Sequence, residues 1–239
     1  MKLLDFTPPS PAENLAADEA LLDAAEAGQS DEVLRFWESP VPFVVLGYSN
    51  RASTEVDVKE CDAAGLPVLR RCTGGGTVVQ GPGCLNYALI LKIEPNNAFQ
   101  SISLANQFIM ARNRTAIQTL LNRPVRIQGY TDLTLGDLKF SGNSQRRHRR
   151  FLLFHGTFLL HADFGLIDKV LRMPSHQPHY RGGRSHSNFL TTLGISATSV
   201  KAALAHDWKA IEPLEAVPQD RIEKLASEKY ATREWSFKF

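Results

Sequence analysis

The chain has few cysteines and no long apolar run. Its three cysteines, Cys61, Cys72 and Cys84, form no Cys-x-x-Cys pair and no matching histidine spacing accompanies them, so neither a disulfide framework nor a structural zinc site is indicated. No apolar stretch approaches membrane-spanning length, and the N-terminus lacks the features of a signal peptide. We therefore expect a soluble, cytoplasmic protein.

Two familiar glycine motifs are also missing. No Gly-Lys-Ser/Thr follows four variable residues, which excludes a P-loop, and the Gly-x-Gly-x-x-Gly spacing of dinucleotide-binding folds does not occur. A net charge of +2 argues against a surface that binds nucleic acid generally. At 239 residues the chain can bury a sizeable core as one domain or two.

The most unusual stretch present is Arg70-Arg71-Cys72-Thr73-Gly74-Gly75-Gly76. Consecutive glycines are costly to order, and they are expected where the backbone passes very close to something else. Adjacent arginines offer forked donors suited to carboxylate or phosphate oxygens. With apolar runs at 66–69 and 87–91 on either side, this pattern predicts a strand-flanked loop that holds an anion. A tight hairpin with two surface arginines is the alternative.

The rest of the pattern predicts an α+β fold with a mixed or antiparallel β-sheet flanked by helices. Ser10, Pro11 and Glu13 form a capping box that starts a helix running through Ala25. Further helices are expected over 54–64, 101–121, 163–171, 198–208 and 219–231. Strands are expected over 32–37, 43–46, 66–69, 87–91, 125–128, 133–135, 138–141, 151–160 and 235–239, with a long loop over 173–188.

A second group of polar residues lies farther along the chain. Asp132 and Lys139 flank a Gly-Asp turn, so a hairpin can bring a carboxylate and an ammonium into one pocket. By periodicity alone, the favoured interpretation is that Lys139 points to water from the polar face of the sheet. His155, within an apolar run, is by itself typical of a hydrogen-bonded core histidine.

Taken together, these segments resemble the lipoate-protein ligase family of the biotin/lipoate ligase superfamily. The resemblance rests on Asn14-Leu15-Ala16-Ala17-Asp18-Glu19, Val45-Leu46-Gly47-Tyr48-Ser49-Asn50, Arg70-Arg71-x-x-Gly74-Gly75-Gly76, Asp132-Leu133 with Lys139-x-Ser141-Gly142, and His155-Gly156-Thr157-Phe158-Leu159-Leu160, in order over roughly residues 1–190. It implies a catalytic-domain fold of that superfamily, one catalytic domain over 1–239 without the accessory C-terminal domain, and a helical closing segment over 190–239.

The resemblance also implies a two-step reaction. Lipoate and ATP, with Mg²⁺, would give lipoyl-AMP and pyrophosphate, and a lysine of a carrier protein would then accept the lipoyl group. Lys139 would be the catalytic cation, Arg70 would neutralise phosphate or the acyl carbonyl, and Asp132 would hold Mg²⁺. The implied binding residues are Gly47, Arg70, Arg71, Gly74, Gly75, Gly76, Thr77, Val78, Val79, Gln80, Asn86, Ser141, Gly142, His155, Gly156 and Thr157. Val79 and Leu46 would line an apolar tunnel, and Lys139 and the triglycine turn should face one cavity.

Two departures from the family pattern bear on the activity. Gln80 stands where a histidine is common, and Tyr48 replaces a common arginine. The nearest alternative is an octanoyltransferase or lipoyl amidotransferase that works through a cysteine thioester. Gly81-Pro82-Gly83 resembles that branch. The nucleophile of such an enzyme is expected near or beyond the Lys139 motif, however, and no cysteine follows Cys84. A non-catalytic lipoate-binding protein is a third possibility.

A basic group completes the pattern. Residues 146–150, Arg-Arg-His-Arg-Arg, together with Arg181, Arg184 and His186, are either a solvated loop face or a docking surface for an acidic lipoyl-carrier domain. No interleaved aromatic residues support nucleic-acid binding, and no membrane partner is expected. A separate accessory-domain protein is a further expected partner.

Overall fold

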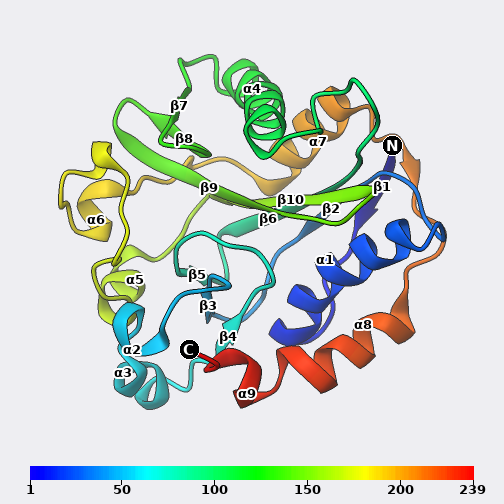
Figure 1. Ribbon diagram of the computed structural model, residues 1–239. Coiled ribbons are helices and arrows are strands. Elements are labelled where there is room, and N and C mark those ends of the chain that lie inside the picture. The colour runs from blue at the N-terminus through cyan, green and yellow to red at the C-terminus, as the bar shows by residue number, and fades with distance from the viewer.

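The computed structural model describes residues 1–239, which form two β-sheets and the helices around them (Figure 1). The large sheet has the order β11-β1-β2-β6-β10-β9-β8-β7, and a small sheet has the order β4-β3-β5. The strands are β1 (Lys2–Asp5), β2 (Val33–Trp37), β3 (Phe43–Leu46), β4 (Val68–Arg70), β5 (Val78–Gln80), β6 (Cys84–Lys92), β7 (Arg126–Gln128), β8 (Asp132–Leu135), β9 (Leu138–Arg147), β10 (Phe151–Leu159) and β11 (Glu212–Pro213).

Both sheets are mixed. In the large sheet β1 runs parallel to β2 and β11, while the remaining neighbours are antiparallel. In the small sheet β3 is parallel to β4 and antiparallel to β5. The predicted α+β class with a mixed sheet is confirmed.

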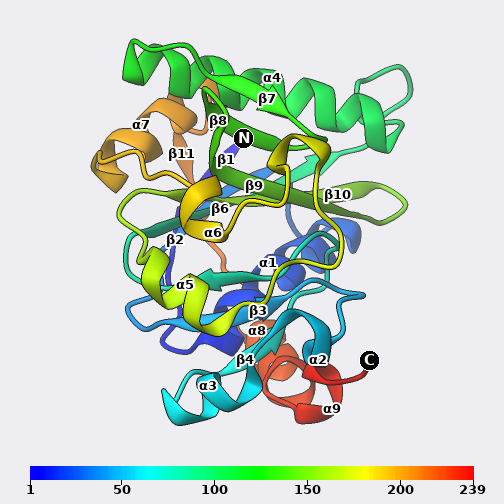
Figure 2. The same ribbon diagram turned by 90° about the vertical axis from the view of Figure 1, so that its left-hand side faces the viewer.

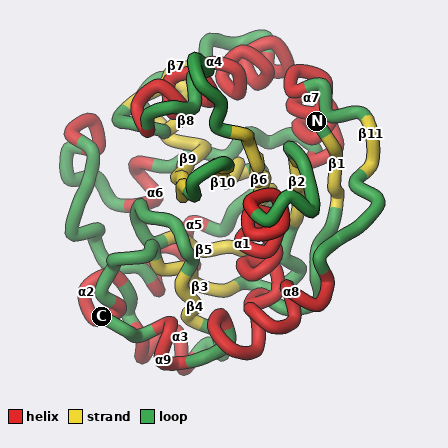
Figure 3. Tube along the Cα trace, turned by 45° about the vertical axis from the view of Figure 1, so that its right-hand side comes forward, coloured by secondary structure: helices red, strands yellow, loops and turns green.

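Helices cover both faces of the large sheet. The helices are α1 (Pro11–Glu26), α2 (Ala52–Glu55), α3 (Val58–Ala63), α4 (Ile102–Leu121), α5 (Phe164–Val170), α6 (His186–Phe189), α7 (Ala197–Trp208), α8 (Gln219–Leu225) and α9 (Arg233–Ser236), with a 3-10 turn η1 (His179–Arg181) and a π-helical turn η2 (Ala226–Tyr230). Helices α4 and α7 lie on one face, and α1, α8 and the small sheet lie on the other (Figures 1 and 3). None of the helices combines the length and apolar character needed to cross a membrane.

Three apolar clusters hold these layers together. One lies between the large sheet and α4 with α7, and includes Ile109, Phe154 and Leu204. A second lies on the opposite face, where α1 and the small sheet both pack. The third lies beyond the small sheet, against α2, α3 and α5 (Figure 2). The small sheet is therefore fixed on both sides, so the loop that follows β4 is held firmly over the large sheet.

Local sequence signals explain the elements that were predicted well. Ser10 and Glu13 form the reciprocal capping box of α1. Ser101 caps α4 and Asp163 caps α5 by accepting from backbone amides. Strand β3 has the predicted bounds, Phe43–Leu46.

Several predicted elements were wrong. The helix expected over 54–64 is divided into α2 and α3, because Val56 forms a β-bridge with Leu171 and Asp57 caps the second helix. The C-terminal strand expected over 235–239 is absent: Thr232 caps α9 instead.

Some boundaries also differed from expectation. Strand β9 continues to Arg147, six residues beyond its predicted end, and the loop expected over 173–188 contains η1 and the start of α6. The short strands β1, β5 and β11 were not predicted.

Candidate active site

The glycine-rich segment connects β4 to β5 and lies against the loop that follows β3. A Cβ on Gly47 would lie 2.0 Å from the carbonyl oxygen of Gly75, and Gly75 has a left-handed φ of +89°. Glycine is therefore required at both positions. At Gly74 and Gly76, by contrast, an added Cβ would meet nothing within 4 Å. The fold itself does not need glycine there, which leaves room for a ligand to approach the backbone.

Arg71 braces this segment from within. Its Nη2 donates to the carbonyl oxygens of Gly74 at 2.5 Å and Gly76 at 2.8 Å, and its Nε donates to Thr73 Oγ1 at 3.0 Å. Burial lowers the pKa of Arg71 to about 10, so the side chain remains cationic at neutral pH. The structure therefore places one positive charge directly at the triglycine turn.

Arg70 points away from the glycine turn and is fully buried. Its guanidinium donates to the carbonyl oxygens of Gly47, Tyr48 and Asn50, and to those of Trp235 and Ser236, over distances of 2.7–3.1 Å. All three guanidinium nitrogens donate to main-chain carbonyl oxygens. Arg70 thus joins the β3–α2 loop to the C-terminal segment, and the geometry lends no support to its predicted contact with phosphate.

The C-terminal segment adds an aromatic layer to this joint. Lys238 Nζ lies 3.5 Å from the ring centroid of Tyr48 and 3.8 Å from that of Trp235. The indole Nε1 of Trp235 donates to the Arg70 carbonyl at 2.8 Å. Tyr48 therefore contacts the chain's own C-terminal end.

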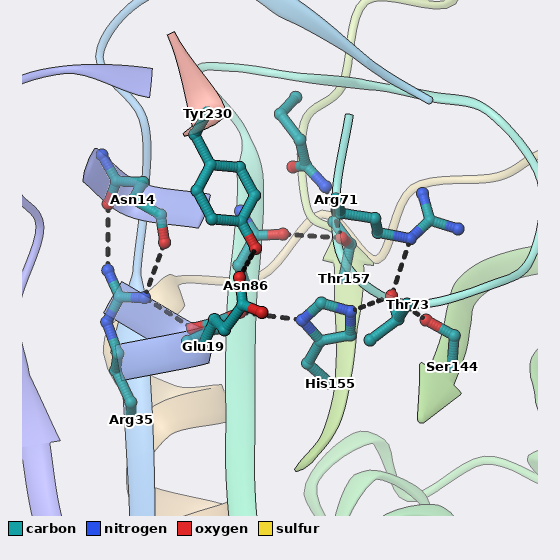
Figure 4. Close-up of polar contacts among 12 residues, drawn as sticks. Asn14, Glu19, Arg35, Arg71, Thr73, Asn86, Ser144, His155, Thr157 and Tyr230 are labelled. Carbon is teal, nitrogen blue, oxygen red and sulfur yellow. Dashed lines mark hydrogen bonds and ion pairs between the residues drawn. The ribbon is translucent and has the colours of Figure 1, made fainter. Parts of the chain in front are cut away.

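Thr73 is the point where the glycine segment meets the large sheet (Figure 4). Its hydroxyl lies 2.7 Å from His155 Nε2 on β10 and accepts from Ser144 Oγ on β9 at 2.9 Å. His155 was a predicted site residue, and the structure brings it to the glycine segment. Ser144 and Thr73 were not predicted.

Behind His155 lies a buried charge pair. His155 Nδ1 is 2.8 Å from Asp18 Oδ2, and Arg35 Nη1 is 2.5 Å from Asp18 Oδ1. Arg35 also contacts the carbonyl and the side-chain oxygen of Asn14. Burial opposes ionisation of Asp18, but Arg35 and the hydrogen bond from His155 outweigh it and hold the pKa of Asp18 below its usual range. The carboxylate is therefore ionised at neutral pH.

Three more predicted residues form a polar row beside His155. Gln80 Nε2 donates to Thr157 Oγ1 at 2.7 Å, and Thr157 donates to Asn86 Oδ1 at 2.6 Å. The remaining Gln80 oxygen, Oε1, is buried without a partner, and so is Thr77 Oγ1. Buried acceptors without partners are unusual and are expected near functional sites.

Gly156 faces the opposite side of the large sheet. A Cβ there would lie 1.7 Å from Asn143 Oδ1, which accepts from Tyr87 at 2.6 Å. Ser141 is buried and accepts from Asn143 Nδ2 at 3.3 Å. Gly156 and Ser141 therefore support the sheet rather than the glycine segment.

Lys139 lies next to Gly142. A Cβ on Gly142 would lie 2.8 Å from Lys139 Nζ, so glycine makes space for the ammonium. Lys139 Nζ is also 2.8 Å from Asp132 Oδ1, and Tyr180 donates to Asp132 Oδ2 at 2.7 Å. A quarter of the Lys139 side chain is exposed.

The ammonium and the glycine segment lie on the same face of the large sheet. Gly142 pairs with Thr157, and Ser144 pairs with His155. Opposed residues of antiparallel strands share a face, and the side-chain period of two places both pairs on the same one. Ser144 and His155 contact Thr73 from this face. Lys139 therefore does not project from the far side of the sheet, although its catalytic role stays a prediction.

The small sheet separates the two apolar residues of the predicted tunnel from the large sheet. Val79 and Leu46 are buried in the cluster against α2, α3 and α5, away from the large sheet. Val78 packs instead against the cluster on the large sheet's side. Val78, and not Val79 or Leu46, therefore faces the side on which His155 and Thr73 lie.

The chain's own side chains offer little to a divalent cation. Both oxygens of Asp132 are engaged, and no cluster of three or more His, Cys, Asp or Glu side chains is placed to hold a metal ion. A Mg²⁺ ion carried by ATP takes most of its ligands from phosphate and water. Asp132 as its protein ligand stays a prediction.

The three thiols are poor nucleophiles. All are buried, and burial raises the pKa of Cys61 and of Cys72 to about 11 and that of Cys84 to about 12. Reactive cysteines have lowered pKa values and partial exposure. None of the three matches that description.

The predicted basic surface is not one surface. Residues 146–150 occupy the end of β9 and the turn into β10, where Arg146 donates to the Cys72 carbonyl and Arg150 lies beside Glu26. Arg184 contacts the carbonyl of Asp137, at the other end of β9. Arg181 is buried against the ring of Phe189. Residues 146–150 and Arg181 with Arg184 therefore lie at opposite ends of a ten-residue strand.

Sequence reasoning missed Asp18, Arg35, Thr73 and Ser144 as partners of the site. Asp18 was visible as a charged residue on the apolar helix α1, and Arg35 as a charge in the middle of a strand. Charged residues at such positions are rarely fully buried unless they are paired. That mismatch between residue type and expected burial was the available signal.

The chain is similar to known lipoate-handling enzymes. It has the fold of a lipoate-protein ligase A structure bound with ATP (TM-score 0.85, 23% identity, 99% of this chain and 98% of the other). A bipartite lipoate protein ligase of Thermoplasma acidophilum, studied with its E2 lipoyl domain, also shares the fold (TM-score 0.84, 22% identity, 99% and 95% covered).

Sequence comparison gives the family. The profile of the lipoyl protein ligase A/B catalytic domain matches residues 10–206, and the chain belongs to this family. Among its relatives are the octanoyltransferase LipM of Carboxydothermus hydrogenoformans (27% identity, 100% of this chain and 98% of the relative) and lipoate-protein ligase A subunit 1 of Thermoplasma acidophilum (27% identity, 98% and 95%). The predicted resemblance to the lipoate-protein ligase family is confirmed, and the family includes both ligases and octanoyltransferases.

Proposed function

We propose that the protein is an ATP-dependent lipoate-protein ligase that forms lipoyl-AMP and transfers the lipoyl group to a lysine of a carrier protein. The supporting observation is the position of Lys139, whose ammonium lies over Gly142 on the face that carries the glycine segment. A carboxylate and a phosphate both need a cationic partner, and Lys139, paired with Asp132 and a quarter exposed, is a cation on this face.

The chemistry asks for positive charge and amide donors at fixed places. When the lipoate carboxylate attacks the α-phosphorus, negative charge develops on phosphate oxygens, and pyrophosphate leaves. Preorganised donors stabilise such charge most effectively where water is excluded. Lys139 would bridge the carboxylate and the α-phosphate, and the backbone of Gly74 and Gly76 would approach the ligand from the same side of the large sheet. ATP would bring Mg²⁺ to the phosphates, where Asp132 is the proposed protein ligand.

Carrier recognition follows from the same position. The second step needs the carrier's lysine to reach the acyl carbonyl, so the carrier must approach the exposed side of Lys139. The bipartite ligase of Thermoplasma was studied with a lipoyl domain, which fits a lipoyl-carrier domain as the acceptor of this chain too. A separate accessory protein, as a second subunit, remains part of the proposal for adenylation.

Octanoyl transfer is the second candidate, because the LipM relative matches the whole chain at 27% identity. The thioester route needs a reactive thiolate. The three buried thiols, with pKa values raised to about 11 or 12, favour the ligase over this route.

One assay separates the two activities. The purified protein is given a lipoyl-carrier domain with either lipoate and ATP or an octanoylated donor carrier without ATP. Pyrophosphate release and the mass of the acceptor domain are then measured. We expect pyrophosphate and a lipoylated acceptor in the first mixture only. An acylated acceptor in the second mixture alone would overturn the ligase proposal. Repeating both reactions with an accessory subunit tests whether such a subunit is needed.

A further inference from the structure

We infer that Asp18 is a positioning residue of the site: it fixes His155 as the tautomer that carries its proton on Nδ1, and through Thr73 this tautomer sets the conformation of the glycine segment. The role in catalysis rests on the proposed function, whereas the tautomer itself does not. The inference depends on one chain of contacts, Arg35–Asp18–His155–Thr73–Arg71. Figure 4 labels Arg35, His155, Thr73 and Arg71.

The proton on the imidazole follows from what Asp18 can do. An ionised carboxylate only accepts hydrogen bonds. Asp18 is 2% exposed, its Oδ1 is 2.5 Å from Arg35 Nη1, and its Oδ2 is 2.8 Å from His155 Nδ1. The Nδ1 atom must therefore carry a proton. In the neutral ring, Nε2 is then an acceptor, and the Thr73 hydroxyl donates to it across 2.7 Å.

Thr73 has no hydrogen-bonding capacity to spare. A hydroxyl has one proton and two lone pairs. The proton goes to His155, while Arg71 Nε at 3.0 Å and Ser144 Oγ at 2.9 Å supply donors to the two lone pairs. If Nε2 carried a proton, three donors would face two lone pairs and the hydroxyl proton would lose its partner. Only the neutral Nδ1–H ring satisfies every group.

The order imposed on Thr73 reaches the triglycine turn through Arg71. The guanidinium that donates to Thr73 also donates to the carbonyl oxygens of Gly74 and Gly76. Reorienting the Thr73 hydroxyl therefore disturbs the brace of the turn. Asp18 does not contact the glycine backbone, so it acts on that backbone only through His155, Thr73 and Arg71 in turn.

The substitution Asp18→Asn tests the assignment of the proton. Arg35 keeps its acceptor at residue 18 only if the asparagine oxygen takes the place of Oδ1. The amide nitrogen then faces His155 Nδ1, which must become an acceptor, and the proton moves to Nε2. Ring nitrogen shifts from long-range ¹⁵N–¹H correlation spectra identify the protonated nitrogen directly. We expect Nδ1–H in the wild-type protein at neutral pH and Nε2–H in the variant.

Binding of free lipoate, measured by calorimetry without ATP, tests the effect on the turn. Loss of one buried hydrogen bond predicts roughly tenfold weaker binding in Asp18→Asn, equivalent to about 1.4 kcal/mol. Thr73→Val should weaken binding similarly, and the double variant should be no weaker than Thr73→Val alone, because both changes break the same chain. Thr73→Ser keeps the hydroxyl and should bind as the wild-type protein does.

Asp23→Asn is the matched control. Asp23 lies on the same helix as Asp18 and pairs with Arg221 at 2.7 Å on the surface. It is not part of the contact chain that runs through His155. It should change neither the ring shifts nor binding. An Nε2–H or doubly protonated ring in the wild-type protein would overturn the inference, as would additive losses in the double variant. If the protein releases no pyrophosphate, the ligase proposal fails, but the ring shifts still decide this inference.

Discussion

Arg70 offers the sharpest test of the structure, because two interpretations of it give opposite results. The sequence pattern assigns it to an anion, whereas the structure places its guanidinium against five carbonyl oxygens, from Gly47, Tyr48, Asn50, Trp235 and Ser236. The substitution Arg70→Met keeps an unbranched side chain at this position and removes every donor. We expect it to destabilise the protein and release the C-terminal segment.

The size of the effect can be bounded. A hydrogen bond to a charged group contributes about 1.5–3 kcal/mol, so five independent acceptors would imply a loss near 10 kcal/mol. That sum is too large, because residues 232–239 can detach and expose the carbonyls of Trp235 and Ser236 to water. Breaking a buried charged network typically costs about 3–5 kcal/mol. We therefore expect a decrease of about 4 kcal/mol in the free energy of unfolding.

Two measurements check this expectation. Urea denaturation gives the change in unfolding free energy, and hydrogen exchange should show lost protection in 232–239 and 47–51. Arg233→Met is the control, since Arg233 is exposed on the same segment and its guanidinium only lies over the Phe237 ring. It should cost less than about 0.5 kcal/mol. Unchanged stability and protection in Arg70→Met, together with lost binding of ATP or lipoate, would refute the structural assignment and support the anion contact.

Four further predictions follow from the site. Lys139→Ala should abolish pyrophosphate release while far-ultraviolet circular dichroism stays unchanged; normal turnover would remove Lys139 from its proposed role. Cys72→Ser and Cys84→Ser should retain most activity, and both wild-type thiols should react slowly with a disulfide reagent, because with a pKa of about 11 only about one Cys72 thiol in ten thousand is ionised at neutral pH. Gly47→Ala should lower the unfolding free energy by about 1–3 kcal/mol in urea titrations, since its Cβ would overlap a carbonyl oxygen; a neutral effect would show that the two loops are free to separate. Because the folded-state pKa of Asp18 is lowered, its stabilising contribution is complete above the ordinary aspartate pKa of about 4 and is lost as the pH falls towards the lowered value; Asp18→Asn should reduce the slope of unfolding free energy against pH in that acid range, and an unchanged slope would contradict the assignment.

Local signals made much of the fold predictable. The capping box at Ser10 and Glu13 and the cap at Ser101 are encoded within four residues, so they could be identified without the tertiary structure. The strand predicted over 138–141 ended too early, because the second half of β9, which includes Arg146 and Arg147, is polar. Its pairing with β10 supplies the hydrogen bonds that the residue types alone do not indicate.

The site was predictable in its members but not in all their contacts. His155 and Lys139 were identified by resemblance, and the structure places both on the face that carries the glycine segment. The direction of Arg70 could not be predicted. Adjacent residues at the end of a strand point to opposite sides, and two of the five residues that accept from Arg70 are Trp235 and Ser236. Pairing between residues so distant in sequence has no local signal.

The ring of Trp235 gives the chain an intrinsic optical probe. Of the three tryptophans, Trp37 and Trp208 are buried in the two main apolar clusters. The Lys238 ammonium lies over the rings of both Trp235 and Tyr48. Tyr48 belongs to the loop that contacts the triglycine turn. Any occupant that shifts this loop must alter the surroundings of that indole. Its fluorescence emission can therefore report binding in unlabelled protein, in real time and without turnover.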